Sequence, residues 1–396
     1  MKIVHINHLY RPFGGGERYL LDICNILEEK GHSVVVVSSR HRENYQINGR
    51  RKEYFIDGSF GIGSGLRLWK TVRDIIRKEN PNLIHIHETL LFLSPFIHGK
   101  LMRLKPTVHT LHTAFYFCPK ASKILPNQEI CSYAMGISCL TKGCSKEINK
   151  RLALNMMWRK RVAKKADYVI APSQYIKGEA VRNGIDREKI EVIPHFTEKN
   201  MRNEYVMPED NSILFVGRTD PLKGIRELLI ALSFMRKKVW KAYIIGIGDG
   251  LQEYEKMAQE IGIQERIVFL NNLEYDELDE YYQKASVVAF PSLSPESFGL
   301  VGIEAMSFGR PVVAFDSGGP KEWLVDGKTG FLVKRGDVKG LSFRIGQLLE
   351  NSSLARRMGL EGQKRLIECY RKESHGKRVM NVYEEAVRMG NSKEFL

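Results

Sequence analysis

Glu296 and Glu304 lie eight residues apart in a segment that joins a predicted strand to a predicted helix. The apolar run 287–290 predicts a buried strand, and a turn of small and polar residues follows it and carries Glu296. Glu304 lies inside an otherwise apolar helix that Gly309 ends. Carboxylates accept hydrogen bonds from hydroxyl groups, so this pair could hold a polyol. Both side chains could equally be solvated, and their spacing alone leaves that alternative open.

The predicted helix that holds Glu304 begins at a glycine-containing turn. Backbone N–H groups at Phe298, Gly299 and Leu300 would lack partners within the helix, and the helix dipole adds partial positive charge there. Such a terminus binds anions, including phosphate. A phosphate site with a carboxylate at each end fits a phosphorylated polyol such as a nucleotide sugar.

Arg218 and Lys223 lie five residues apart after a second predicted strand, 213–216. Arg218 leaves the strand, and Lys223 opens the next helix together with Gly224. A single lysine or arginine is usually solvated. Two cations beside one strand–helix turn can converge on one anion, which favours a phosphate.

The chain begins with a predicted strand, 2–7, and the glycine-rich loop HLYRPFGGG, 8–16. In doubly wound folds the loop after the first strand approaches a phosphate, and glycine lets the backbone come close. The glycines lack the Gly-x-Gly-x-x-Gly spacing, so a flexible turn is the alternative. His112 ends the predicted strand 107–112 at the carboxyl edge, where ligands bind in open sheets, although a histidine in a strand is more often structural.

These segments together resemble the group 1 family of retaining nucleotide-sugar glycosyltransferases. PESFGLVGIEAMSFGRPVVAFDSGG, at 295–319, is similar to the family's Glu-x7-Glu signature, and GRTDPLKG, at 217–224, to its Gly-Arg…Lys-Gly element. TLHTAFYFCP, at 110–119, resembles the family's Thr-Leu-His-Asp element, with Thr113 in place of the usual Asp. The resemblance covers nearly the whole chain and is strongest over 213–333.

The resemblance implies an α/β fold of GT-B architecture, with two doubly wound parallel-sheet (Rossmann-like) domains facing a cleft. We expect an acceptor-side domain at 1–200, a nucleotide-sugar donor domain at 201–372 and a helix at 373–396 that crosses back onto the first domain.

The resemblance also implies a role for each site residue. The catalytic set is His112, Glu296, Arg218 and Lys223. The donor-binding set is Gly15, Gly16, Ser297, Phe298, Gly299, Leu300, Glu304 and Asn271. Glu296 is expected to bind sugar hydroxyls, Glu304 the ribose, and His112 the donor sugar. The two cations would bind the leaving diphosphate. Since the sequence contains no Asp-x-Asp pair for a divalent ion, we expect no metal and no cofactor.

The expected reaction is retaining transfer of a sugar from a UDP- or GDP-sugar to an acceptor hydroxyl. The expected acceptor is a glycan or lipid-linked glycan in cell-surface polysaccharide biosynthesis. A GT-B-fold sugar-nucleotide epimerase, which would turn over the donor without an acceptor, is one alternative. A catalytically silent nucleotide-sugar-binding protein is the other, and the intact cations and glutamates argue against it.

Four cysteines crowd the irregular insertion 117–145, at Cys118, Cys131, Cys139 and Cys144. Four thiols in a reducing compartment could hold a structural zinc ion. The spacing has no Cys-x2-Cys pair, so reduced or reversibly paired thiols are the other interpretation.

The 61 Lys+Arg against 46 Asp+Glu give a net charge of +15, which favours anionic partners. Without zinc-finger spacing or an aromatic RNA-binding motif, nucleic acid is not expected. The basic segment 146–165, with Met157 and Trp158, is either an ordinary surface helix or one that docks on an anionic membrane. The sequence has no run of 18 apolar residues and no signal-peptide pattern, so we expect a cytoplasmic protein, peripheral on the inner face of the membrane.

Overall fold

The structure is a computed structural model that divides the chain into two compact units. It describes residues 1–10, 14–40, 51–57, 62–89, 93–118, 120, 122–144, 157–158, 160–161, 163–200, 205, 207–208, 211–235 and 238–393. The first unit contains Met1–His195 and Glu373–Leu396, and the second contains Phe196–Lys372. Residues 146–156, 159 and 162 of the expected basic helix 146–165 lie outside the described residues.

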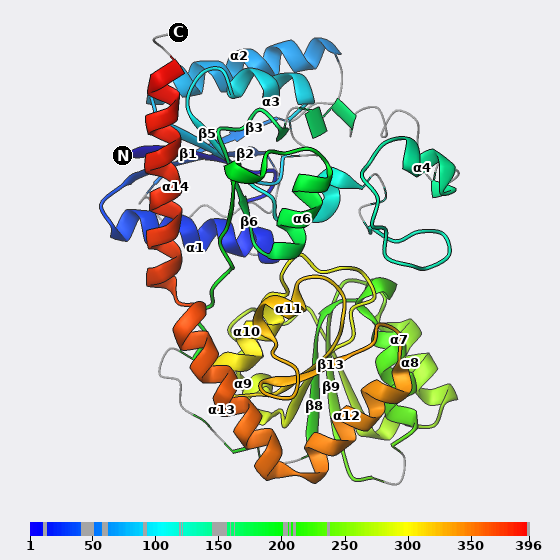
Figure 1. Cartoon of the computed structure of the whole chain (residues 1–396). Helices are drawn as coiled ribbons and strands as arrows, with labels where there is room; N and C mark the ends of the chain where they lie inside the picture. The colour runs from blue at the N-terminus through cyan, green and yellow to red at the C-terminus, as the bar shows by residue number, and fades with distance from the viewer. Residues whose placement is uncertain are drawn as a thin grey trace. The chain divides into compact units, whose positions relative to one another are not determined.

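The first unit is built on a seven-stranded parallel sheet with the order β3-β2-β1-β4-β5-β6-β7. Figure 1 labels β1, β2, β3, β5 and β6 of this sheet. Its strands are β1 (Lys2–Ile6), β2 (Ser33–Ser39), β3 (Lys52–Ile56), β4 (Leu83–Ile86), β5 (Thr107–Thr110), β6 (Tyr168–Ala171) and β7 (Ile190–Val192). Its helices are α1 (Gly15–Glu29), α2 (Ile62–Glu79), α3 (Pro95–Leu101), η1 (Ala114–Phe117), α4 (Ile137–Thr141), α6 (Gln174–Arg182) and η3 (Arg187–Lys189). From Glu373 onward, α14 (Lys372–Lys393) also belongs to this unit.

Alternate side chains of the central strands face opposite sides of this sheet, as the two-residue period of a strand requires. Val4 and Ile84 belong to an apolar cluster with residues of α2 and α3. His5 and His85, next to them in β1 and β4, point the other way, and His85 reaches Tyr383 of α14. Both histidines are fully buried, so this face carries polar side chains in its core.

The second unit has a six-stranded parallel sheet with the order β10-β9-β8-β11-β12-β13. Its strands are β8 (Ser212–Arg218), β9 (Lys241–Ile247), β10 (Ile267–Asn271), β11 (Val287–Phe290), β12 (Val312–Phe315) and β13 (Gly330–Val333). Its helices are η4 (Pro221–Lys223), α7 (Ile225–Ser233), α8 (Leu251–Glu260), η5 (Gln264–Arg266), α9 (Leu278–Lys284), α10 (Leu300–Ser307), α11 (Pro320–Trp323), α12 (Val338–Glu350) and α13 (Ser352–Cys369).

Two apolar clusters cover the two faces of the second sheet. Phe215 of β8 packs in one cluster with residues of α7, α8 and α12. Leu214, its neighbour in sequence, packs in the other with residues of α9, α10, α11 and α13. Strands covered on both faces are near-continuous apolar runs, which is why β11 and β12 both read VVAF.

Two boundaries differ from those predicted. The first segment of the first unit ends at His195, a few residues before the predicted boundary near residue 200. β5 ends at Thr110, so His112 lies two residues beyond the strand rather than at its last position. Among the described helices, none has both the length and the apolar content needed to cross a membrane.

Candidate functional site

In the second unit, the candidate site lies where the sheet reverses its strand order. β8 is the first strand of this unit, and it lies between β9 and β11. In open parallel sheets ligands bind at the carboxyl ends of strands at such a switch point. η4 follows β8, and the loop with Glu296 follows β11, so both elements lie at this point.

Lys223 and Glu296 form an ion pair at the switch point. Lys223 Nζ donates to Glu296 Oε1 at 2.6 Å, and Ser292 Oγ donates to the same oxygen at 2.5 Å. Burial alone would raise the pKa of Glu296. The charge and hydrogen bond of Lys223, with Ser292 and Arg218, outweigh burial and lower that pKa. The carboxylate is therefore ionised at neutral pH and can accept further hydrogen bonds from hydroxyl groups.

Gly224 allows the two loops to approach each other. Its φ is +79°, and a Cβ added there would lie 1.9 Å from the carbonyl oxygen of Pro291. Just beyond Pro291, the N–H of Leu293 donates to the carbonyl of Leu222 at 2.7 Å. A side chain at 224 would therefore push Lys223 away from Glu296.

Arg218 lies differently from Lys223. Its side chain is 62% exposed and pairs with Asp220 at 3.3 Å. Its charge still contributes to lowering the pKa of Glu296. The structure thus brings both predicted cations to one carboxylate, one in contact with it and one near it at the surface.

The amino end of α10 has the open geometry expected of an anion site. Its N-cap residue Gly299 has φ +91° and offers no side-chain cap. Ser297, Gly299 and Leu300 are partly exposed, whereas Phe298 is buried and its carbonyl accepts from the indole of Trp323 at 2.7 Å. The helix end is therefore anchored at Phe298, and its N-cap residue, a glycine, has no side chain to cap the first-turn N–H groups.

The turn at Gly318–Gly319 holds the loop that carries Glu296 in place. The N–H of Gly319 donates to the carbonyl of Glu296 at 2.7 Å. A Cβ on Gly319 would lie 2.6 Å from Cα of Phe298, so only glycine fits against this backbone.

Glu304 is buried between two tyrosines. Tyr275 donates to its Oε1 at 3.0 Å and Tyr282 to its Oε2 at 2.8 Å. Burial first, and then the Glu304 charge, raise the pKa of Tyr282 well above its usual value, so this hydroxyl stays a donor. Each carboxylate oxygen can accept more than one hydrogen bond, so the pairing leaves capacity for a ribose. Sequence reasoning missed both tyrosines. Asn271, predicted to lie near the base, is exposed at the end of β10.

The first unit also has a switch point, between β1 and β4. α1 begins at Gly15, shortly after β1, and Gly16 lies against His112. A Cβ added to Gly16 would lie 3.4 Å from Cγ and 3.7 Å from Nδ1 of His112. The structure therefore brings Gly16 and His112 together.

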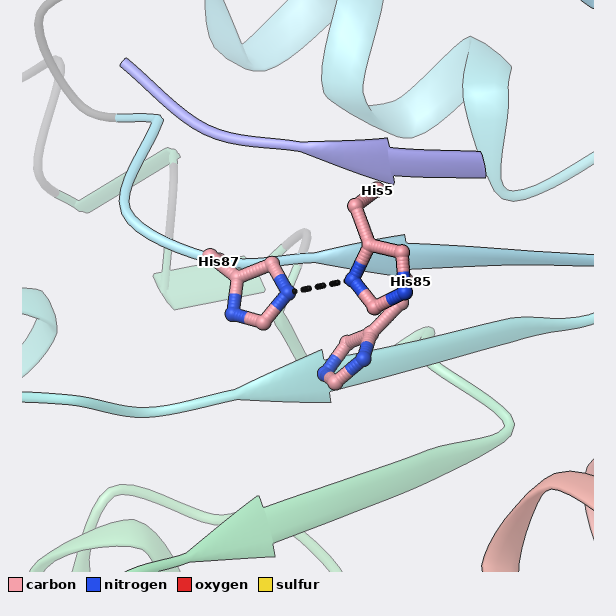
Figure 2. Close-up of side chains that lie close together, drawn as sticks. All are labelled: His5, His85 and His87. Carbon is pink, nitrogen blue, oxygen red and sulfur yellow. Dashed lines mark hydrogen bonds between the residues drawn. The ribbon is translucent and has the colours of Figure 1, made fainter. Parts of the chain in front are cut away.

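His112 is the end of a row of buried histidines, of which Figure 2 shows His5 and His87. His5 Nδ1 lies 2.9 Å from His87 Nε2, and His87 Nδ1 lies 3.0 Å from His112 Nε2. Burial lowers the pKa of His112 to about 4, so its ring is neutral at physiological pH. Sequence reasoning gave His5 no role, although the alternation in HIHE, residues 85–88, does place His85 and His87 on one sheet face.

His5, His85 and His87 are also the only group among the described residues whose ligand atoms gather as a metal site would. Their ring nitrogens lie within 4.8 Å of one another. Both nitrogens of His85 already have partners, however, with Tyr383 OH at 2.6 Å and Thr110 Oγ1 at 2.7 Å. A metal would have to displace one of these hydrogen bonds.

The four clustered cysteines line one small cavity in the first unit. Cys118 and Cys144 are buried, Cys131 and Cys139 are partly buried, and none forms a disulfide. Lys123 is buried beside them and pairs with Glu179 at 2.7 Å, so it could offset the negative charge of a zinc–thiolate centre. No three of these sulfurs gather within 4.8 Å, so the cavity would have to contract around an ion. Zinc here stays a prediction, tested by metal analysis of the purified protein with the four-serine variant as control.

Two family profiles match this chain, one for each half. Glycosyltransferase Family 4 matches residues 13–199, and Glycosyl transferases group 1 matches residues 197–365. A GDP-mannose-dependent alpha-(1-6)-phosphatidylinositol monomannoside mannosyltransferase of Mycolicibacterium smegmatis is 29% identical over 56% of this chain and 63% of its own length. A D-inositol 3-phosphate glycosyltransferase of Nocardia farcinica is 34% identical over 51% of this chain and 49% of its own length. The chain thus spans about half to two thirds of these relatives.

Solved structures match over a longer range. Sucrose-phosphate synthase from Thermosynechococcus elongatus has a TM-score of 0.77 at 22% identity, covering 97% of this chain and 98% of its own. Anabaena HepE in complex with UDP and glucose has a TM-score of 0.73 at 20% identity, covering 97% and 99%. These likenesses confirm the predicted fold class, two parallel-sheet Rossmann-like domains of the GT-B kind.

Proposed function

Because this chain belongs to the group 1 family of glycosyltransferases, we propose that it transfers a sugar from a nucleotide-diphosphate donor to an acceptor hydroxyl. The observation that carries the proposal is the Lys223–Glu296 pair at the switch point of the second sheet, beside the uncapped end of α10. The cation and the helix terminus can bind a diphosphate, and the ionised carboxylate can accept hydrogen bonds from the sugar that the diphosphate carries.

Lys223, Arg218 and the first turn of α10 would stabilise the charge that develops on the leaving diphosphate. Lys223 and the first turn of α10 are held in place before the reaction, so they need no reorganisation when the bond to the sugar breaks. Glu296 would accept hydrogen bonds from the sugar hydroxyls, and its contact with Lys223 keeps it ionised. We assign the contact with the donor sugar in the first unit to His112.

We further propose that the configuration at the anomeric carbon is retained. Glu296 is held by Lys223 and Ser292 and is assigned to the sugar hydroxyls, so front-face displacement, with the donor phosphate taking the acceptor proton, fits better than a glycosyl-enzyme intermediate on this carboxylate. The anomeric configuration of the product, read by NMR, would decide this point, and an inverted product would contradict it.

Nucleotide binding is the first test of the proposed function. Ligands that bind the folded state raise the free energy of unfolding by RT ln(1 + [L]/Kd), so one nucleotide among UDP, GDP, ADP, CMP and TDP should raise Tm most. We expect UDP or GDP, with the same shift in EDTA because cations of the protein would hold the diphosphate. A shift that EDTA abolishes would contradict the metal-independent site. No shift with any nucleotide would contradict the donor site itself.

For the acceptor, we propose a glycan or lipid-linked glycan of cell-surface polysaccharide biosynthesis at an anionic membrane surface. The net charge of +15 supports this, as do two apolar side chains of the basic segment, Met157 and Trp158, which are 43% and 52% exposed. The chain should float with anionic vesicles and not with neutral ones. Equal flotation with both would remove the proposal of an anionic surface and leave the transferase proposal unchanged.

A further inference from the structure

A row of three hydrogen-bonded histidines runs through the core of the first unit and ends at His112. His5 comes from β1, His87 follows β4, and His112 follows β5. The contacts are His5 Nδ1 to His87 Nε2 at 2.9 Å and His87 Nδ1 to His112 Nε2 at 3.0 Å. His5 and His87 are fully buried, and His112 is 5% exposed. Figure 2 shows the first of these contacts, between the rings of His5 and His87.

All three rings are neutral at physiological pH. Burial, and then the charge of Arg51, lowers the pKa of His5 to about 3. Burial, followed by the neighbouring histidines, lowers the pKa of His87 well below its usual value. A neutral imidazole has one donor nitrogen and one acceptor nitrogen. The row therefore has only two complete proton arrangements, and choosing the tautomer of one ring fixes the other two.

The two ends of the row differ in their surroundings. Nε2 of His5 and Nδ1 of His112 have no hydrogen-bond partner among the residues that the structure describes. Arg51, whose side chain is 1% exposed and pairs with Glu28 at 2.9 Å, lies close enough to His5 for its charge to lower the pKa of that ring. A nearby cation favours a lone pair over an N–H on the nitrogen outside the hydrogen-bonded row. Nε2 of His5 should therefore be unprotonated, and Nδ1 of His5 should carry the proton.

The amino end of α1 acts on the other end of the row. Its partial charge of about +0.5 would favour a lone pair on Nδ1 of His112. Arg51 acts on His5, however, whereas burial alone lowers the pKa of His112. Arg51 should therefore decide the arrangement. His5 then donates to His87, His87 donates to Nε2 of His112, and the proton of His112 is on Nδ1, beside Gly16.

We propose that His5 and His87 are positioning residues that hold His112 in the Nδ1–H tautomer, so that His112 presents a hydrogen-bond donor to an oxygen of the donor sugar. The sugar contact rests on the proposed function, whereas the tautomer does not. A metal at His5, His85 and His87 is the competing use of the same side chains, and the two hydrogen bonds of His85 oppose it.

The tautomer can be read directly from the resting protein. Two-bond nitrogen–proton NMR correlations of histidine rings distinguish Nδ1–H from Nε2–H, and the His112 signals are assigned by their loss in His112→Gln. We expect His112 as Nδ1–H and His5 as Nδ1–H in the wild type. An Nε2–H tautomer of His112, or averaging between the two forms, would overturn the proposal. So would a stoichiometric metal that His5→Leu removes.

A matched pair of variants separates positioning from packing. His5→Asn keeps a donor N–H near the position of Nδ1, whereas His5→Leu removes the donor at a similar volume. We expect His5→Leu to release the tautomer of His112 and to lower kcat about tenfold, the scale of one hydrogen bond, with the nucleotide-induced rise in Tm unchanged. His5→Asn should restore both the tautomer and kcat. Equal losses in the two variants would mean that His5 only fills space.

Failure of the positioning proposal and failure of the proposed function give different results. Loss of the expected His112 tautomer with normal nucleotide binding contradicts the positioning proposal alone. The expected tautomer in a protein that binds no nucleotide supports the positioning proposal and contradicts the donor site.

Discussion

Lys223→Met is expected to lower kcat about a hundredfold or more. Removing one preorganised group that stabilises developing negative charge typically costs about 3 kcal/mol of transition-state stabilisation. Lys223 also contacts Glu296 at 2.6 Å. The variant therefore loses the positive charge for the diphosphate and leaves the Glu296 carboxylate without its cationic partner. Arg218 is 62% exposed and more strongly screened, so Arg218→Met should have the smaller effect.

The same substitution should change how Glu296 titrates. Lys223 holds the pKa of Glu296 below its usual value, so the pair stabilises the fold above the unfolded pKa of about 4.3 and loses that contribution as pH falls through the folded pKa. In Lys223→Met the pKa of Glu296 should rise, because burial then acts with less opposition. The double variant Lys223→Met/Glu296→Gln should recover stability at neutral pH without recovering activity.

Steady-state kinetics and thermal unfolding from pH 3 to 8 would measure both effects. Lys256→Met, at a lysine that is 77% exposed on α8, is the matched control and should leave activity unchanged. A Lys223→Met enzyme with wild-type kcat would contradict the assignment of this cation to the leaving group.

The positions of these groups were largely predictable, because they depend on the order of elements. Strand, loop and helix alternate along the sequence, and parallel strands bring all their following loops to one edge of the sheet. Arg218, Lys223 and Glu296 each follow a predicted strand, so their shared edge followed from the sequence. Their pairing did not, because the contact depends on the backbone approach at Gly224, where a side chain would meet the carbonyl of Pro291.

The buried polar contacts were not predictable, because each joins elements distant in sequence. His5 reaches His87 only because β1 lies beside β4, and His85 reaches Tyr383 across 298 positions. The local pattern HIH, at residues 85–87, predicts that two histidines lie on the same face of the sheet, but it does not predict their hydrogen-bond partners. The same holds for Tyr282, which reads as an ordinary residue of α9 until the packing of α10 brings Glu304 against it.

Glu304→Gln is expected to weaken nucleotide binding about tenfold to a hundredfold, the loss of a charge-assisted hydrogen bond to ribose. Glu304 also has a structural role, since Tyr275 and Tyr282 both donate hydrogen bonds to its oxygens. A loss of affinity could therefore arise from ribose recognition or from disturbed packing of the tyrosines. Glutamine keeps one accepting oxygen and nearly the same volume. Glu304→Gln should therefore lower the Tm of the ligand-free protein only slightly compared with its effect on nucleotide affinity.

Tyr282→Phe separates the two explanations. It removes the buried hydroxyl that holds Oε2 but leaves the carboxylate and its charge. If Glu304 binds the ribose, Tyr282→Phe should lower the Tm of the free protein and leave the nucleotide-induced rise nearly intact, whereas Glu304→Gln should cut that rise. Calorimetric Kd values for the preferred nucleotide would quantify both variants. Equal losses of affinity in the two would show that Glu304 acts by holding α9 against α10, and the ribose contact would then have to be sought elsewhere at the carboxyl edge of this sheet.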